Sequence, residues 1–326
     1  MHDFLDQLAA ASTHLFQSEI LYWGSLLFWG YGLFYLVTLI TLYGVHTSKV
    51  RQHYSWAGFC AYAFPKHIYQ HASFREDLYL FAFQSTLRLL FKTLTIISTL
   101  MLAQICAEQI SAGLQNVFDS KGLEWVPAEN LRFVYFLGIV LAADFGNFLG
   151  HYLLHHVPFL WEFHKVHHSA VHLTPITQFR AHPVEPLIRH LGTSLCMGTL
   201  MGLGAFVFTQ VPQDFFIDTA VFLLVYNLTV HLRHSHLWVS FGPILSYIFI
   251  SPAQHQIHHS IEPRHLHKNI GIMFSFWDLL FGCLYVPQDK EDFRIGLTST
   301  DEHKELEGFW HLLWVPIVNA YKRLKV

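Results

Sequence analysis

Histidines at short, repeated spacings are the residues of this chain best suited to chemistry. Two segments, WEFHKVHH and HQIHH, share the spacing H-x-x-H-H and contribute His164, His167, His168, His255, His258 and His259. Of the 25 histidines in the chain, 17 lie between His151 and His267. Imidazole is a good ligand for iron, copper, zinc and nickel, so this concentration indicates a metal site without naming the metal.

A third cluster ends an apolar stretch with the sequence DFGNFLGHYLLHH, residues 144–156. On an α-helix His151 and His155 share a face, whereas His156 lies about 140° around the axis from His151. Pro158 favours a helix end here, because helices tend to stop before a proline, and either His155 or His156 then remains a candidate. Residues 164, 167 and 168, like 255, 258 and 259, fall on a narrow arc of a helix.

The number of clustered histidines predicts two metal ions. A single histidine on an apolar face is more often a hydrogen-bonded core residue, but three clusters at helical spacing would be costly to desolvate without a partner. Eight or more donors exceed what one ion binds. Paired Glu-x-x-His motifs, which a ferritin-like di-iron bundle needs, are excluded, because the one example, Glu262 to His265, contains Pro263.

Other site chemistries find no support in the sequence. It has no H-E-x-x-H, no G-x-S-x-G, no phosphate loop and no G-x-G-x-x-G turn, so we expect the chain not to hold NAD(P)H or flavin itself. The four cysteines form no C-x-x-C pair, which argues against a disulfide framework or an iron–sulfur cluster. A net charge of −3 gives no electrostatic reason to expect nucleic acid.

The elements that must position these histidines are membrane helices. The chain is 52% hydrophobic and only 13% charged, about half the charge of an average soluble domain. Runs long enough to cross a bilayer core lie at 21–43, 87–107, 131–154, 187–209 and 215–230. Burial of five such runs inside a soluble protein is the less favoured alternative. We predict an all-α integral membrane bundle of four to five spans with a histidine-rich helical cap.

Lysine and arginine, which favour the cytoplasmic side of short loops, predict the orientation. Five crossings put 18 of the 20 basic residues on one face, and only Lys121 and Arg132 on the other. We therefore expect an outside N-terminus, an inside C-terminus and cytoplasmic histidine clusters. The first 20 residues lack the positive start of a cleavable signal peptide and are expected to form a short surface helix.

These motifs resemble the sterol desaturase and fatty acid hydroxylase superfamily, which comprises membrane-bound non-haem di-iron oxygenases. The resemblance spans about Asp144 to Val286, with an acidic residue seven before the first ligand histidine and boxes similar to LWEFHKVHHS and SPAQHQIHHS. FRAHPVE with His182 and RHSHL with His234 match two further segments. The ending NIGIMFSFWDLLFG resembles the family at Asn269, Gly271, Trp277 and Asp278.

The resemblance implies the site and its cofactors. The ligands would come from His151, His155, His156, His164, His167, His168, His182, His231, His234, His255, His258 and His259, with His231 included for its place three residues before His234. Carboxylates that accept the free ring N–H would come from Asp144, Glu162, Glu185 and Asp278. Two Fe ions would use dioxygen to hydroxylate or desaturate a lipid, and zinc can replace iron in purified samples.

Departures from the family pattern leave the substrate open. Tyr152 stands where relatives usually have arginine, Cys283 where a threonine often follows, and His172 where relatives are often acidic. A sterol, a fatty acyl chain, an ornithine lipid and a carotenoid all remain candidates. The stripe Phe274, Phe276, Trp277 and Phe281 either lines a lipid channel or packs in the core, and packing is the more common role.

We expect the chain to divide into an N-terminal membrane region at 1–130, a catalytic domain at 131–286 and a polar cytoplasmic tail at 287–326. We expect no fused cytochrome domain, and we therefore expect electrons to come from a separate ferredoxin- or cytochrome b5-like protein with its reductase. The alternative hypothesis is a histidine-rich metal transporter or sensor. A transporter needs polar residues along a path through the bilayer, whereas the histidines are predicted to cluster at one face of the membrane.

Overall fold

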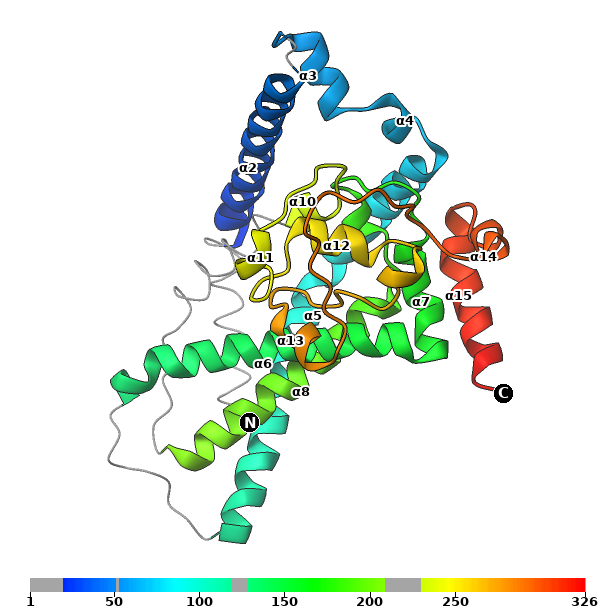
Figure 1. Ribbon diagram of the computed structural model, residues 1–326. Coiled ribbons are helices and arrows are strands. Elements are labelled where there is room, and N and C mark those ends of the chain that lie inside the picture. The colour runs from blue at the N-terminus through cyan, green and yellow to red at the C-terminus, as the bar shows by residue number, and fades with distance from the viewer. Residues whose placement is uncertain (1–19, 51–52, 119–127, 209–229, 326) are drawn as a thin grey trace.

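Helices form the regular structure of this protein. The computed structural model describes residues 20–50, 53–118, 128–208 and 230–325, and within these ranges the β-structure consists of isolated bridges, with no strand. The predicted all-α class is therefore confirmed for the described part of the chain. The elements in chain order are α2 (Ile20–Lys49), α3 (Trp56–Ala63), α4 (Lys66–Tyr69), α5 (Ala72–Phe118), α6 (Ala128–His156), α7 (Pro158–His168), η2 (Thr177–Phe179), α8 (Val184–Val207), α10 (Val230–Arg233), α11 (Gly242–Leu245), α12 (Pro252–His258), η3 (Pro263–His265), α13 (Phe276–Leu280), α14 (Thr300–Glu305) and α15 (Phe309–Arg323) (Figure 1).

Two helices in the described ranges are long and apolar enough to cross a bilayer. They are Phe133–His156 within α6 and Val184–Val207, which is α8, and they correspond to two of the predicted spans. The predicted spans at 21–43 and 87–107 lie within the helices α2 and α5. The span predicted at 215–230 falls almost entirely outside the described residues, as do residues 1–19 of the expected surface helix.

Glycines bring the backbones of α6 and α8 into contact. A Cβ atom on Gly146 would collide with the backbone carbonyl of Gly192, and a Cβ on Gly150 would lie 2.8 Å from Cα of Arg189. Gly146 and Gly150 form a G-x-x-x-G pair, a spacing that lets membrane helices approach closely. This crossing fixes the end of α6, which carries His151, against the start of α8.

A second glycine pair joins α8 to α5. A Cβ on Gly202 would lie 2.7 Å from the carbonyl oxygen of Ala107, and Gly198 meets Ala103 one turn away. Small residues on both helices therefore allow the same close approach. Helices α5, α6 and α8 thus form one packed unit, in which α8 contacts both of the others (Figure 1).

The turn between α6 and α7 redirects the chain beside the site. Helix α6 ends at His156, Val157 is extended, and Pro158 begins α7. Proline is tolerated in the first helical turn, where its missing N–H has no intrahelical partner. The predicted break at Pro158 is confirmed, and it brings the histidines of α7 back toward those of α6.

Short elements between residues 230 and 285 cover the ends of the long helices. Helix α12 begins with a capping box, in which Ser251 Oγ accepts from Gln254 N at 3.2 Å and Ser251 N donates to Gln254 Oε1 at 2.9 Å. Gln256 Nε2 then donates to the carbonyls of Ser235 at 3.0 Å and Leu237 at 2.7 Å. These bonds fasten α12 to the segment that contains His234.

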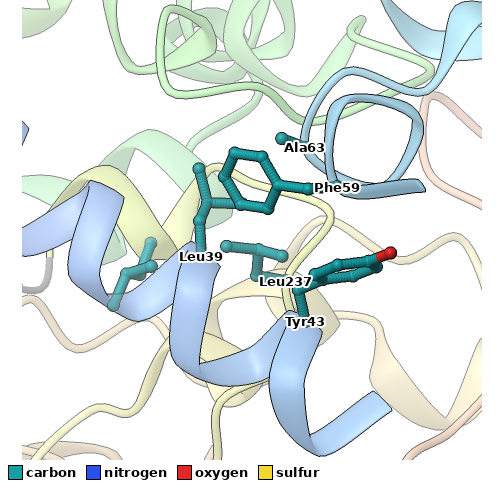
Figure 2. Packing of buried hydrophobic residues seen from close by; sticks show 6 residues of the cluster. Leu39, Tyr43, Phe59, Ala63 and Leu237 are labelled. Atoms are coloured by element: carbon teal, nitrogen blue, oxygen red, sulfur yellow. The ribbon is translucent and has the colours of Figure 1, made fainter. Parts of the chain in front are cut away.

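The C-terminal end of α2 packs on this cap. Leu39 and Tyr43 of α2 and Phe59 of α3 surround Leu237, and all four side chains are buried (Figure 2). Burying each large apolar side chain stabilises the fold by about 1.5–3 kcal/mol. This cluster anchors α2 to the part of the chain that supplies His234.

Residues 287–326, expected to be a polar tail, instead contain the helices α14 and α15. Helix α15 packs against α7 and contacts α5, and its Leu312 is fully buried with Leu80 and Val166. Composition was misleading here because the charged residues concentrate before residue 308, whereas the sequence from Phe309 onward is mostly apolar.

Candidate metal centre

Four helical segments deliver histidines to one buried region. His151 and His155 occupy the last turns of α6, while α7 contributes His164, His167 and His168. Helix α12 and its C-cap supply His255, His258 and His259, and His234 directly follows α10. The nine side chains are all at most 8% exposed, although they come from positions more than 100 residues apart.

One group of four histidines consists of His151, His155, His164 and His258. One ring nitrogen from each lies within 4.8 Å of the others. The Nε2 atoms of His151 and His164 are 3.0 Å apart, and those of His155 and His258 are 3.2 Å apart. The ring nitrogens of α6, α7 and α12 therefore meet at one point.

A second group of four consists of His167, His234, His255 and His259, again with one ring nitrogen each within 4.8 Å of the others. His234 Nε2 lies 3.1 Å from His167 Nε2 and 3.0 Å from His255 Nε2. We name the two sets the first and second histidine groups.

His168 lies between the two groups. Its Nε2 atom is 3.2 Å from His164 Nε2 of the first group, and its ring centre is 4.6 Å from that of His259 in the second. The nine histidines thus form one continuous cluster with two centres.

The donor atoms fit two metal ions. Two nitrogens bound at about 2.0–2.1 Å with angles near 90–110° lie roughly 2.8–3.4 Å apart, and the Nε2 separations of 3.0–3.2 Å fall in this range. Both ring nitrogens of His259 are buried without a hydrogen-bond partner among the described residues. Leaving a buried polar atom unpaired is costly, so a cation that takes one of these nitrogens as a ligand suits the site.

Burial keeps these rings in the neutral form that binds metals. It lowers the pKa of His167 to about 4 and that of His258 to about 3. Burial also lowers the pKa of His168, His234, His255 and His259 well below the ordinary value, and neighbouring histidines add to the effect. At neutral pH these six imidazoles therefore offer a free lone pair.

Backbone carbonyls orient three of the rings. His151 Nδ1 lies 2.6 Å from Ile270 O, His167 Nδ1 3.0 Å from Arg180 O, and His258 Nδ1 3.0 Å from Lys268 O. A carbonyl oxygen only accepts, so each Nδ1 carries the proton and each Nε2 faces the cluster with its lone pair. This arrangement of hydrogen bonds around metal ligands also fixes the direction of each ring.

Of the four predicted outer carboxylates, Glu185 lies against a ring of the cluster. Its Oε2 atom is 3.0 Å from His164 Nδ1, and its other oxygen lies 3.4 Å from Arg189 Nη1. Glu185 belongs to the first turn of α8, where the helix dipole favours a negative charge. Glu162 instead pairs with Lys165 and Arg323.

Asp144 and Asp278 hold the loop whose Ile270 carbonyl contacts His151. Asp278 accepts from Ile270 N at 2.7 Å and Gly271 N at 2.9 Å. Asp144 accepts from Trp277 Nε1 at 3.0 Å and from two backbone N–H groups of the same loop. Burial raises the pKa of Asp278 to about 7, against the opposing effect of the Cys283 thiol and the two backbone donors. Both carboxylates therefore act on the cluster through the loop.

Three predicted ligands lie outside the cluster of nine histidines. His156 stacks on Tyr152 at 3.9 Å between ring centres. Both nitrogens of His182 are used, Nε2 by Leu313 O at 3.0 Å and Nδ1 by Val184 N at 3.2 Å. His231 Nδ1 contacts Gln178 Nε2 at 2.8 Å. We leave all three out of the ligand set that we propose.

Arg180 has a structural role that the histidine motifs did not predict. Its buried guanidinium donates to Asp77 at 3.0 Å, to Glu76 at 2.9 Å and to Ser169 Oγ. Its backbone carbonyl accepts a hydrogen bond from His167 Nδ1. It therefore ties the end of α7 to the start of α5. The segment FRAHPVE pointed to this residue, because it places Arg180 between α7 and α8, which both contribute residues to the site.

A cavity of about 240 Å³ borders the first group. His155, His168 and His258 line it together with Trp161, Ser260 and residues near Leu297. The aromatic stripe that was a candidate channel wall packs elsewhere. The ring centres of Trp277 and Phe145 are 4.7 Å apart, and Phe274 stacks on Phe276 with 4.9 Å between ring centres. The aromatic stripe therefore does not line the cavity beside the first group.

The region that holds the cluster is similar to known lipid-modifying proteins. Residues 136–283 match the family model described as fatty acid hydroxylase. Ornithine lipid hydroxylase OlsE of Rhizobium tropici is 31% identical over 188 residues, covering 57% of this chain and 50% of that protein. Alkylglycerol monooxygenase of Caenorhabditis elegans is 26% identical over 175 residues, 52% of this chain and 31% of the relative.

The human alkylglycerol monooxygenase is 27% identical over 153 residues, which cover 46% of this chain and 30% of the relative. The matched region thus spans about a third to a half of the length of these curated relatives. No solved structure matches this chain.

Proposed function

We propose that the protein is a membrane-bound di-iron hydroxylase of a lipid and a member of the fatty acid hydroxylase family, whose model matches residues 136–283, as the histidine motifs predicted. The observation that carries the proposal is the pair of buried groups of four histidines. Their imidazole donors suit iron, and their number suits two ions. The names of the relatives favour hydroxylation over desaturation.

In the proposed mechanism the metal supplies the reactivity, and the protein binds the metal and orients its ligands. Bound iron would supply the capacity to use dioxygen against an unactivated C–H bond. The eight histidines of the two groups would bind the two ions. The carbonyls of residues 180, 268 and 270 orient three of the rings, and Glu185 contacts the His164 ring. His168 lies between the groups, and because burial lowers the pKa of its ring, the ring is neutral at pH 7 and its lone pair is free. Burial of the cluster keeps bulk water away from it.

The proposed substrate is a membrane lipid with an alkyl or acyl chain. Two relatives are named for an alkylglycerol and an ornithine lipid, and both names describe amphiphiles. The cavity beside His155 and His258 offers room for the reacting end of such a chain. We propose a separate ferredoxin- or cytochrome b5-like protein with its reductase as the electron donor, because the chain has no motif for a flavin or nicotinamide cofactor.

We also propose that α6 and α8 cross the bilayer with two or three further spans, and that the histidine cluster and C-terminus face the cytoplasm. The distribution of 18 of the 20 basic residues supports this orientation. A cysteine placed at residue 119 should be labelled from the non-cytoplasmic side. Labelling from the cytoplasmic side alone would overturn the orientation.

A metal transporter or sensor remains the rival function. Transport needs polar groups along a path through the bilayer, whereas the histidines of α6 gather in its last turns. This distribution supports a reaction site at the end of the span. Bound metal alone does not separate the two functions, but oxygen-dependent conversion of a lipid does.

Lipid analysis of cells with and without the gene tests the proposal. We expect one or more lipids to gain a mass of one oxygen atom only when the intact gene is present. A His258→Ala variant expressed at the same level should give the lipid profile of cells without the gene. Unchanged lipids, together with an altered cellular metal content, would favour the rival function instead.

A further inference from the structure

The C-terminal helix α15 has two apolar faces, of which the protein buries one. Leu312, Pro316 and Ala320 point into the molecule. The opposite face carries exposed apolar residues at intervals of three and four positions, namely Trp310, Trp314, Ile317, Tyr321 and Leu324. Trp310 is 68% exposed and Trp314 is 61% exposed, so two large aromatic surfaces lack cover. A stripe of this size on one helix marks an interaction surface.

The composition of this face fits a lipid headgroup region. Tryptophan and tyrosine favour the membrane–water interface, and Lys322, Arg323 and Lys325 lie at the end of the same helix. The sequence from Phe309 to Val326 contains no acidic residue. Basic residues beside an apolar helical face are typical of helices that lie on anionic membranes.

The neighbours of α15 are residues at the ends of the long apolar helices. Its Leu313 carbonyl contacts His182, two residues before α8 begins, and Arg323 contacts Glu162, shortly after α6 ends. Phe309 packs on Phe83 of α5 at 5.6 Å between ring centres, just before the span predicted at 87–107. Helix α15 lies beside α7 (Figure 1). These contacts place it near the ends at which α5, α6 and α8 would leave the bilayer.

An apolar groove links α15 to the outer surface of α5. Tyr79, Ala82, Phe83 and Thr86 of α5 and Phe309 line this groove of about 470 Å³. Along α5 the same face continues at intervals of four residues to Leu90 and Leu94, which are 67% and 62% exposed. A continuous apolar surface thus runs from the predicted span to the start of α15.

We propose that α15 lies flat in the headgroup region of the cytoplasmic leaflet and binds anionic phospholipid through its exposed stripe and its terminal lysines. The inference rests on the proposed membrane placement of α6 and α8, and it adds a lipid contact outside the matched family region. Helices of this kind bury their apolar face about 5–10 Å into the boundary between headgroups and acyl chains.

Site-directed spin labelling of the full chain tests the proposal. Nitroxides are attached at Trp314→Cys or Ile317→Cys, in a background with Cys60, Cys106 and Cys196 changed to alanine. The protein is placed in nanodiscs that contain phosphatidylglycerol. Collisions with dioxygen, which concentrates in hydrocarbon, are compared with collisions with a nickel chelate, which stays in water. Two reference labels, Leu195→Cys on α8 and Lys304→Cys on α14, define the lipid and aqueous limits.

We expect the ratio of oxygen to chelate collisions at residues 314 and 317 to exceed that at residue 304 severalfold. The paired change Lys322→Glu and Lys325→Glu should lower this ratio toward the aqueous limit. Ratios at 314 and 317 equal to that at 304, or low collision rates with both reagents as at a protein contact, would overturn the proposal. If residue 195 also matched residue 304, the membrane placement of α8 itself would fail.

Discussion

At the scale of single residues, the direction of each ring decides which histidines can share a metal. His151, His167 and His258 each direct Nδ1 to a backbone carbonyl and Nε2 to the cluster. His182 uses both nitrogens in hydrogen bonds to the backbone and cannot do the same. Use of both nitrogens therefore excludes His182 from the proposed ligand set, whereas position excludes His156, whose Nδ1 lies 2.8 Å from Tyr152 O outside the two groups.

His258 is the residue whose loss should have the clearest effect. It lies in the first group, 3.2 Å from His155 between Nε2 atoms, and its ring is fixed by Lys268 O. We expect His258→Ala to abolish detectable product and to lower the metal content, while the protein still inserts, because insertion depends on the apolar helices. Elemental analysis and a lipid assay measure both effects.

The control is His53→Ala, which changes an exposed histidine outside the cluster. It should keep most of the activity and the full metal content. Full turnover by the His258→Ala variant, in an assay where the parent protein needs oxygen and reductant, would remove His258 from the proposed site.

Glu185 should matter through His164. The Glu185→Gln change keeps the size of the side chain but removes the charge that lies 3.0 Å from His164 Nδ1. Loss of such an outer carboxylate typically costs about 10- to 100-fold in metal affinity or activity. Metal affinity measured by competition with a chelator should fall in this range. The matched change Glu307→Gln, at an exposed glutamate, should leave the affinity unchanged, and equal affinities in both variants would exclude this role for Glu185.

Spacing alone predicted most of the clustered residues but not the orientation of the rings. The positions of His151 and His155 on one helical face followed from a period of 3.6 residues, and the structure places His156 outside. The roles of Ile270 O and Lys268 O had no side-chain signal, because any residue supplies a carbonyl. His231 shared the helical spacing of a ligand, yet Gln178 takes its Nδ1 atom.

At the scale of elements, the close crossing of α6 and α8 connects the membrane region to the site. The crossing places His151 of α6 and Glu185 of α8 on the two sides of His164. Gly146 and Gly192 make this possible, since neither backbone leaves room for a side chain at the contact. A change in the helix separation must therefore move ligands as well as lipid-facing residues.

Gly146→Val should damage the site from a distance. The added side chain would meet the Gly192 backbone, and such overpacking typically costs about 1–3 kcal/mol. We expect reduced thermal stability in detergent and reduced metal occupancy. Gly113→Ala, at a helical position in α5 with open space around a new Cβ, should be neutral or slightly stabilising. Normal metal occupancy in Gly146→Val would mean that the crossing does not position His151.

Apolar runs and prolines predicted the long helices, and local patterns did not predict the rest. The end of α6 followed from Pro158, because proline restricts the residue before it. Helix α15 was missed because 15 residues are too few for a span and the charged segment before it suggested a tail. The order of the short elements around α12 depends on tertiary bonds such as those of Gln256, which leave no periodic signal.

At the scale of the whole molecule, folding keeps six titratable imidazoles neutral, and this makes stability depend on pH. In the unfolded chain histidine titrates near 6.5, whereas His167 and His258 in the fold titrate near 4 and 3. Below pH 6.5 the unfolded chain therefore binds more protons than the folded chain, so stability falls as pH falls toward 4 and 3. Above about pH 6.5 this contribution is fully present.

The thermal unfolding temperature of the metal-free protein in detergent should thus decrease between pH 6.5 and 4. Asp278 acts in the opposite direction, because its raised pKa of about 7 stabilises the fold as pH falls from 7 toward 4, but it is one group against six histidines. An unfolding temperature that stays constant or rises on acidification from pH 6.5 to 5 would contradict the assignment of neutral, buried imidazoles.

Incorporation of labelled dioxygen tests the central claim most directly. The purified protein, loaded with iron and supplied with reductant, an electron-donor protein and extracted membrane lipid, is incubated under ¹⁸O₂, and the lipids are analysed by mass spectrometry. A lipid hydroxylase should add one ¹⁸O atom per product molecule, and His258→Ala should add none. A product that carries oxygen from water, or an iron-loaded protein that leaves all lipids unlabelled while the donor is oxidised, would contradict a di-iron lipid hydroxylase.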